Sequence, residues 1–211
     1  MKRMIAIFAL VASGSLWAAS NRELTLDVPM DGASVISLDV GVGELNVRPS
    51  DDGDVHARVR LEKSGSWFWP FGKSSAQIDQ AKLKARRDDD TLVLGVKTGH
   101  RHRKFKERWD LYVPDNAQIS IDMGVGAVEI RDVEAPMDVE LGVGDVDIRC
   151  KRAWIGTING EVGVGDVSIH GADQTETERH IVGGTSSGKG EGKLDITVEV
   201  GVGDATVRLD R

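Results

Sequence analysis

The sequence of 211 residues is poor in cysteine, proline and aromatic side chains, and it has no excess of positive charge. Its single cysteine, Cys150, cannot form an internal disulfide. We expect a small apolar residue at a strand end, with an intermolecular disulfide as the alternative. The 5 prolines, 25 glycines and many valines exclude collagen-like and disordered chains and are typical of strands joined by tight corners. The formal net charge of −7 argues against a nucleic-acid partner, since phosphate binding needs a basic face.

Long apolar runs are also missing, with one exception near the N-terminus. Two basic residues precede an apolar run over residues 4–11, and residues 18–20 (Ala-Ala-Ser) offer a small-x-small cleavage pattern. The run is too short to span a membrane comfortably. The sequence therefore predicts a cleaved signal peptide over residues 1–20, and a periplasmic or secreted mature chain over residues 21–211.

What the sequence does contain is an internal repeat built around Gly-Val-Gly. The five matching segments are residues 38–47, 121–130, 140–148, 161–169 and 199–207. The first glycines of the last four units stand at positions 124, 142, 163 and 201, at steps of 18, 21 and 38. The last step is about two periods of 19, so we expect one degenerate unit near residues 181–188.

Each repeat alternates apolar and other residues, and the phase of this alternation shifts once, after the second glycine. In the third unit Leu141 and Val143 occupy odd positions, whereas Val146 and Ile148 occupy even ones. A straight strand with this pattern would turn half of its apolar residues to water, but a strand that bends between the halves would not. Because glycine adopts positive φ without steric cost, we interpret the second glycines as corners or bulges. These structural corners are Gly43, Gly126, Gly144, Gly165 and Gly203.

Two short strands and a corner, repeated every 18–21 residues, make one coil of a parallel β-helix, and stacked coils would align the valines inside. We therefore predict an all-β fold, a parallel β-helix (solenoid) of about five to six short coils. An antiparallel meander or sandwich is the alternative. Residues 48–118 interrupt the repeat and predict an antiparallel hairpin lobe inserted after the first coil. Residues 119–211 would be the regular coils, and residues 21–211 a single domain.

The repeat and the strand before it resemble those of a known family. The strand that ends in Val113-Pro114, the Gly-x-Gly-[Asp/Ala]-Val strands and the repeat of about 19 residues resemble the bacterial DUF4097 or "toastrack" β-solenoid domains, also described as adhesin-type domains. The resemblance covers roughly residues 35–210. In that family the later corners more often have Ser-Gly-Asp or Asn-Gly-Asp, whereas Val-Gly dominates here. The resemblance implies an extracytoplasmic, non-enzymatic module linked to adhesion or envelope stress, with no catalytic residues to carry over.

No combination of residues predicts a catalytic or metal site. Asp145, Asp166 and Asp204 invite comparison with calcium-binding β-rolls, but there the Asp stands one position further along, and Ca²⁺ needs roughly six or more oxygens. His100 and His102 lack a nearby cysteine or acidic cluster that would complete a tetrahedral site. Repeated outward carboxylates indicate solubility more than glycoside hydrolysis, which needs two carboxyls in a cleft. We therefore expect no enzyme activity, no cofactor and no metal.

Two segments of the interrupted region are candidate contacts with a partner or a membrane. The first, residues 66–72, contains Trp67, Phe68, Trp69 and Phe71. It is either a cap over the solenoid end or an exposed patch for a partner. The second, residues 100–108, contains Arg101, Arg103, Lys104 and Lys106. It is either a solvated hairpin tip or a site for an anionic partner, such as phosphorylated headgroups or an acidic protein.

These observations favour an exported, non-catalytic binding or scaffold module of the cell envelope, adhesin-like, whose partner is a protein or an envelope surface. The alternative is a membrane-surface or envelope-stress sensor that uses residues 66–72 and 100–108 on an anionic lipid surface. An enzyme that acts on glycans is the least favoured interpretation. The sequence leaves open the partner, the oligomeric state, and the choice between periplasm and cell exterior.

Overall fold

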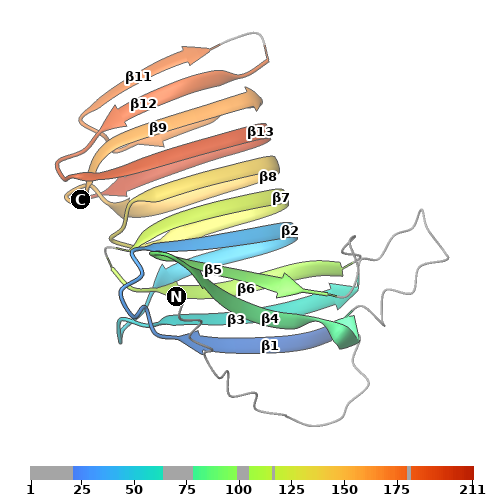
Figure 1. Ribbon diagram of the computed structural model, residues 1–211. Coiled ribbons are helices and arrows are strands. Elements are labelled where there is room, and N and C mark those ends of the chain that lie inside the picture. Colours follow the sequence, from blue (N-terminus) through green and yellow to red (C-terminus); the bar gives the residue numbers. More distant parts are fainter. Residues whose placement is uncertain (1–20, 64–77, 99–104, 116, 180–181) are drawn as a thin grey trace.

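The computed structural model describes residues 21–63, 78–98, 105–115, 117–179 and 182–211, which are almost entirely β-structure (Figure 1). The strands are β1 (Asn21–Val28), β2 (Val35–Pro49), β3 (Val55–Lys63), β4 (Lys82–Asp88), β5 (Thr91–Lys97), β6 (Phe105–Val113), β7 (Gln118–Arg131), β8 (Met137–Lys151), β9 (Ile155–Val164), β10 (Val167–His170), β11 (Gln174–Arg179), β12 (Gly184–Lys189) and β13 (Leu194–Asp210). No helix in this described part combines the length and apolar character that a membrane crossing requires.

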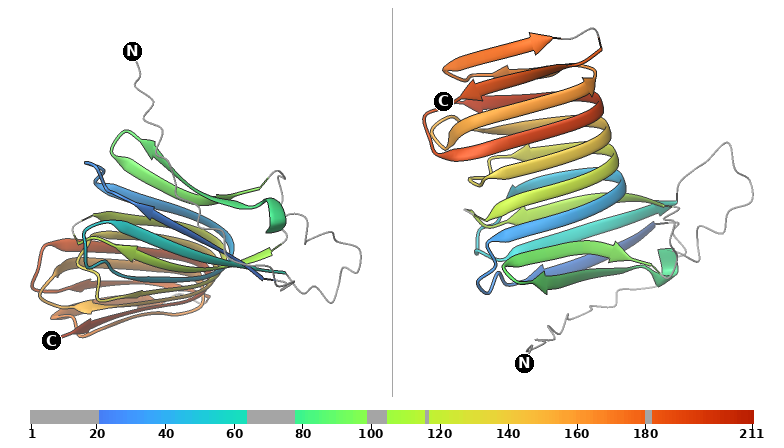
Figure 2. Two further views of the ribbon diagram at one scale, coloured as in Figure 1. Left: turned by 90° about the horizontal axis from the view of Figure 1, so that it is seen from below. Right: turned by 45° about the horizontal axis from the view of Figure 1, so that its top comes forward.

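All of these strands belong to one 13-stranded sheet. Its main path is β1-β3-β6-β2-β7-β8-β13-β9-β12-β11, with β10 beside β13, and with β5 between β4 and β2. Four long strands, β2, β7, β8 and β13, run through the centre and bend (Figure 2). In β2, residues 35–38 pair with β5 whereas residues 43–49 pair with β6. The bend therefore divides the sheet into two wings.

The first wing contains the first halves of the long strands, with β5 and β4 at one end and β9, β12 and β11 at the other. The second wing contains their second halves, with β6, β3 and β1 at one end and β10 at the other. The inner faces of the two wings enclose one hydrophobic core, and strands such as β8 contribute alternate residues to it. Trp109 of β6 is among the largest fully buried side chains.

The four long strands pair in parallel with their repeats in register. Gly126 lies beside Gly43 of β2 and beside Gly144 of β8, which in turn lies beside Gly203 of β13. This agrees with the expectation that near-identical units stack like on like. Each position of the repeat consequently forms a column of similar residues along the stack.

The stacking order differs from the order of the repeats along the chain. Because β13 lies between β8 and β9, the unit at 199–207 stacks directly on the unit at 140–148. The predicted degenerate coil near residues 181–188 is wrong, since β12 pairs antiparallel with both β9 and β11. Strands β11 and β12 have only small, polar or charged side chains, and cannot supply the two apolar half-strands of a coil. Residues 119–211 are therefore not regular coils throughout.

Antiparallel pairs do occur within residues 48–118, where β3 pairs with β6, and β4 with β5. They do not form a separate lobe, however, because β5 and β6 also pair in parallel with β2 and continue its two wings. The register places the end of β5 and the start of β6 at the level of the bend in β2. These two strands thus occupy the positions that the two halves of one more bent strand would have.

One part of the predicted interior is wrong, because the central valine of each Gly-Val-Gly unit faces solvent. Val143 is 46% exposed, whereas Leu141 before it and Val146 after it are buried. The phase shift occupies the four residues from Gly142 to Asp145, none of which is buried. The core is filled instead by the apolar residues two positions before and three positions after each central valine.

Candidate functional site

The bend is the most regular outward feature of the molecule, and close strand stacking requires its glycines. A Cβ atom on Gly142 would lie 2.6 Å from the carbonyl oxygen of Gly124, and one on Gly144 would lie 1.8 Å from that of Gly126. Gly144 also has a φ of 137°, which L side chains rarely adopt. Backbone contact therefore accounts for both glycines of the motif without a ligand.

The aspartate after the second glycine connects neighbouring strands at the bend. Oδ1 of Asp145 accepts a hydrogen bond from the backbone N–H of Asp204 at 3.3 Å, and Oδ1 of Asp204 accepts one from the N–H of Asp166 at 2.9 Å. These carboxylates satisfy backbone donors where the ladder is irregular. Within the described residues, no group of three or more His, Cys, Asp or Glu could hold a metal ion.

The central valines form one continuous apolar column, which we call the valine ridge. In stacking order its members are Val42, Val125, Val143, Val202 and Val164. Each is 45–48% exposed, and together they are five of the seven large hydrophobic side chains exposed in the described part of the chain. The residue before each valine is a glycine, so no side chain covers the valines on the side of the first wing. The bend is therefore an apolar strip as well as a corner.

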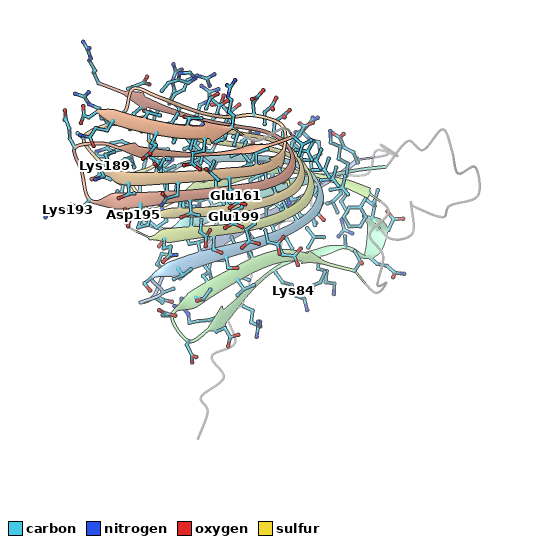
Figure 3. All side chains as sticks on the ribbon, turned by 90° about the horizontal axis from the view of Figure 1, so that it is seen from above. Lys84, Glu161, Lys189, Lys193, Asp195 and Glu199 are labelled. Atoms are coloured by element: carbon cyan, nitrogen blue, oxygen red, sulfur yellow. The ribbon has the colours of Figure 1, made fainter. Side chains whose placement is uncertain are left out.

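Acidic side chains border the valine ridge on both sides. Three positions before each valine, the first acidic column consists of Asp39, Asp122, Glu140, Glu199 and Glu161. Two positions after each valine, the second acidic column consists of Glu44, Asp145, Asp204 and Asp166, with Ala127 at the remaining place. Glu161 and Glu199 lie side by side on the outer face of the first wing (Figure 3).

The first wing is hollowed where the first acidic column meets its last strands. This hollow has a volume of about 390 Å³ and is lined by residues of β9, β11, β12 and β13. Its charged lining residues are all acidic, namely Glu161, Glu176, Glu178 and Glu199. The negative charge of the first acidic column therefore extends over a concave part of the surface.

The outer face of the second wing is balanced by ion pairs between neighbouring strands. Glu129 of β7 lies 2.6 Å from Nη2 of Arg48 and from Nε of Arg131, and Asp147 lies 2.5 Å from Arg208. Hydrogen bonds from Arg131 and Arg48 lower the pKa of Glu129 to about 2. No ion pair to another described residue is formed by Asp122, Glu140, Glu199 and Glu161. The two wings thus differ in how their outward charge is balanced.

Most of the predicted contact residues lie outside the described residues, namely Trp67, Phe68, Trp69, Phe71, Arg101, Arg103 and Lys104. Lys106, by contrast, lies in β6, where its Nζ is 2.5 Å from Oε1 of Glu44. Arg108 of the same strand lies 2.9 Å from Oε2 of Glu44. Hydrogen bonds from Lys106 and then Arg108 lower the pKa of Glu44. Two of the five basic residues of segment 100–108 are therefore held in an internal ion pair.

A second cluster of titratable groups joins two distant parts of the sequence, residue 27 and residues 52–56. Nδ1 of His56 on β3 lies 2.7 Å from Asp27 of β1, and its Nε2 lies 2.8 Å from Asp52. The contacts with Asp52 and then Asp27 raise the pKa of His56, and the contact with His56 lowers the pKa of Asp52 to about 2. Sequence analysis missed this cluster because only the pairing of β1 with β3 places Asp27 opposite His56.

Cys150 lies in β8 with its side chain fully buried, beside Leu209 of β13. Burial raises the pKa of its thiol to about 12. This position suits a small apolar core residue, and in the folded chain the thiol is out of reach of a second molecule.

Comparison with known proteins gives a likeness of fold alone. No protein-family model matches the sequence, and no curated protein matches it. The structure of a "putative cell adhesion protein" from Clostridium sporogenes ATCC 15579 matches over 90% of this chain and 100% of its own, with 16% identity and a TM-score of 0.53. That of a "putative adhesin" from Bacteroides fragilis NCTC 9343 covers 88% of this chain and 97% of its own, but its 12% identity and TM-score of 0.27 are too low to support a shared fold. The chain therefore shares the all-β architecture of the Clostridium sporogenes protein.

Proposed function

We propose that this chain is a non-catalytic, adhesin-like binding scaffold of the bacterial cell envelope, exported by a signal peptide over residues 1–20. The observation that carries the proposal is the in-register stacking of bent parallel strands, which repeats each outward residue as a column. Such columns suit contact with an extended surface of another protein. The proposal includes a β-solenoid of the toastrack type, and the fold shared with the Clostridium sporogenes protein supports it.

The position of the strongly shifted titratable groups supports a role without catalysis. The pKa values of Glu129 and Asp52 are both lowered to about 2. Both carboxylates are held in surface ion pairs, Glu129 with arginine and Asp52 with His56. Their charge is fixed by these partners, whereas a general acid or base needs a pKa near the working pH.

A membrane-surface or envelope-stress sensor is the alternative, and it has less support. Lys106 and Arg108, two of the basic residues it would use, are already paired with Glu44, and Arg108 also with Glu62. The acidic columns along the bend would also be repelled by the negative surface potential of an anionic bilayer.

Binding of the purified mature chain to two separate targets tests this proposal. Surface plasmon resonance would measure its binding to delipidated envelope proteins of the source bacterium, and to vesicles of phosphatidylglycerol and phosphatidylethanolamine. We expect saturable binding to the protein fraction, reproduced by one purified component, and none to the vesicles. Binding to vesicles alone would favour the sensor, and release of reducing sugar from cell-wall glycans would show an enzyme.

A further inference from the structure

We propose that the valine ridge and its two acidic columns form a docking strip for a basic amphipathic helix of a partner protein. The inference rests on the proposed function, since it names the surface and the class of partner through which the scaffold would bind.

The valines of the strip are exposed without a structural reason of their own. Leu141 and Val146 fill the core beside Val143, and the glycines meet the steric demands of the bend. Threonine is also β-branched and suits a strand equally well at an exposed position. Apolar side chains nevertheless occupy this position in all five units and form a line, which is typical of a surface that another protein covers.

The first acidic column works against the stability of the sheet. Register places Glu140 directly between Asp122 and Glu199, and like charges opposite each other on neighbouring strands are destabilising. The second wing avoids this repulsion by pairing Asp147 with Arg208. Within the described residues the first acidic column has no such counter-charge at Asp122, Glu140, Glu199 or Glu161. A cationic partner would supply it.

The dimensions of the strip fit a helix that lies along the stacking axis. Neighbouring strands are about 4.8 Å apart, so five valines span roughly 19 Å, the length of about 13 helical residues. The two acidic columns are five positions apart along the chain, which places them at most about 17 Å apart. A helix is roughly 10–12 Å wide, so lysine or arginine side chains on either side of its apolar face reach both columns.

Charge decides between this helix and other occupants of the strip. A second copy of the chain, docked ridge to ridge, would bring acidic columns against acidic columns. An anionic lipid surface would meet the same repulsion. Charge complementarity therefore favours a partner whose apolar stripe has basic residues on both sides.

The probe is a fluorescent synthetic peptide of about 14 residues, with leucine along one helical face and lysine on both sides of it. Its controls are a scrambled peptide of the same composition and a peptide with glutamate in place of lysine. Fluorescence anisotropy with the mature chain measures the Kd at low and at physiological salt. We expect the lysine peptide to bind, more weakly at the higher salt, and both controls to bind at least about tenfold more weakly.

The apolar half of the strip is tested by Val125→Ser combined with Val143→Ser. The matched control is Tyr112→Ser, because Tyr112 is another exposed large hydrophobic side chain and lies near the end of β6, away from the bend. All three side chains are exposed, so every variant should unfold at the wild-type temperature. We expect the double variant to bind the lysine peptide at least about tenfold more weakly, and the control to bind as the wild type does.

The charged half is tested by Glu140→Gln combined with Glu199→Gln. The matched control is Asp51→Asn with Asp115→Asn, an equal charge change in the turns after β2 and β6, at the strand ends away from the bend. We expect the glutamine variant to bind the lysine peptide more weakly and with a smaller salt dependence, while its melting temperature stays the same or rises. The asparagine control should bind as the wild type does.

The docking strip is refuted if the double valine variant binds like the wild type, or if the scrambled or glutamate peptide binds as well as the lysine peptide. Loss of binding to vesicles in the valine variant would reassign the strip to a membrane and refute it too. Binding to envelope protein tests the proposed function independently of the strip. Envelope-protein binding that survives the valine changes refutes the strip and leaves the scaffold role intact, whereas a wild-type chain that binds neither peptide nor envelope protein refutes both.

Discussion

Among single residues, the second glycines of the repeat are the least replaceable. Gly144 combines a φ of 137° with a backbone oxygen of the next strand 1.8 Å from where a Cβ would stand. We expect Gly144→Ala to lower the free energy of unfolding by at least about 1–3 kcal/mol from the backbone conformation alone, with the clash in addition. Urea unfolding followed by circular dichroism measures the change.

Gly95 of β5 is the matched control for this substitution. A Cβ there would meet no atom within 4 Å. Gly95→Ala should therefore leave stability unchanged, or raise it slightly by restricting the unfolded chain. Equal losses in the two variants would contradict the steric account of the bend.

Among the elements, β1 is an edge strand that is hydrogen-bonded to β3 and carries Asp27, one of the two carboxylates around His56. The pKa of His56 is raised above its usual 6.5, so its contribution to stability is full below pH 6.5 and is lost as pH rises through the folded-state pKa. The pKa of Asp52 is lowered from 3.8 to about 2, so its contribution is full above pH 3.8 and is lost as pH falls towards 2. The cluster therefore stabilises β1 most between these two limits.

We expect His56→Gln to lower the melting temperature most near pH 5 and least near pH 8. The side chains are largely exposed, so the difference should be a few degrees at most. Differential scanning calorimetry from pH 3 to pH 8 measures it. His170→Gln, at an exposed histidine of β10, is the control, and an equal pH-dependent loss there would contradict the role of the Asp27–His56–Asp52 cluster.

For the whole molecule, Cys150 reports on the opening of the sheet. It is fully buried in β8, which lies between β7 and β13, and the pKa of its thiol is raised to about 12. We expect a maleimide reagent to modify it only as fast as the molecule unfolds, with a rate that rises steeply with urea. Mass spectrometry of the labelled chain follows the reaction. Modification in native buffer at the rate of an exposed thiol would place Cys150 outside the core.

The sequence predicts part of the arrangement of strands in the whole molecule. Near-identical units predicted parallel, in-register stacking, because each unit offers its neighbour the same backbone and the same inner face. They could not predict the order β8-β13-β9, because equivalent units stack almost equally well in any order. The repeats also could not show that Val143 faces solvent. The alternation of apolar residues fits a two-residue corner, which would bury Val143, as well as a four-residue corner, which exposes it. The contact of His56 with Asp27 depends on strand register, which no local pattern specifies.

The place of β13 in the sheet determines when the fold can be completed. β13 is made after β9, β10, β11 and β12, yet it is the strand that joins β9 to β8. Until β13 has been synthesised, β8 and β9 each lack one neighbouring strand. Pairings between segments so far apart in the sequence form slowly. The strands from β1 to β8 can pair with one another before β13 exists, but β9 cannot be joined to them until β13 has been made. The stack is therefore completed in its middle by the strand that is synthesised last.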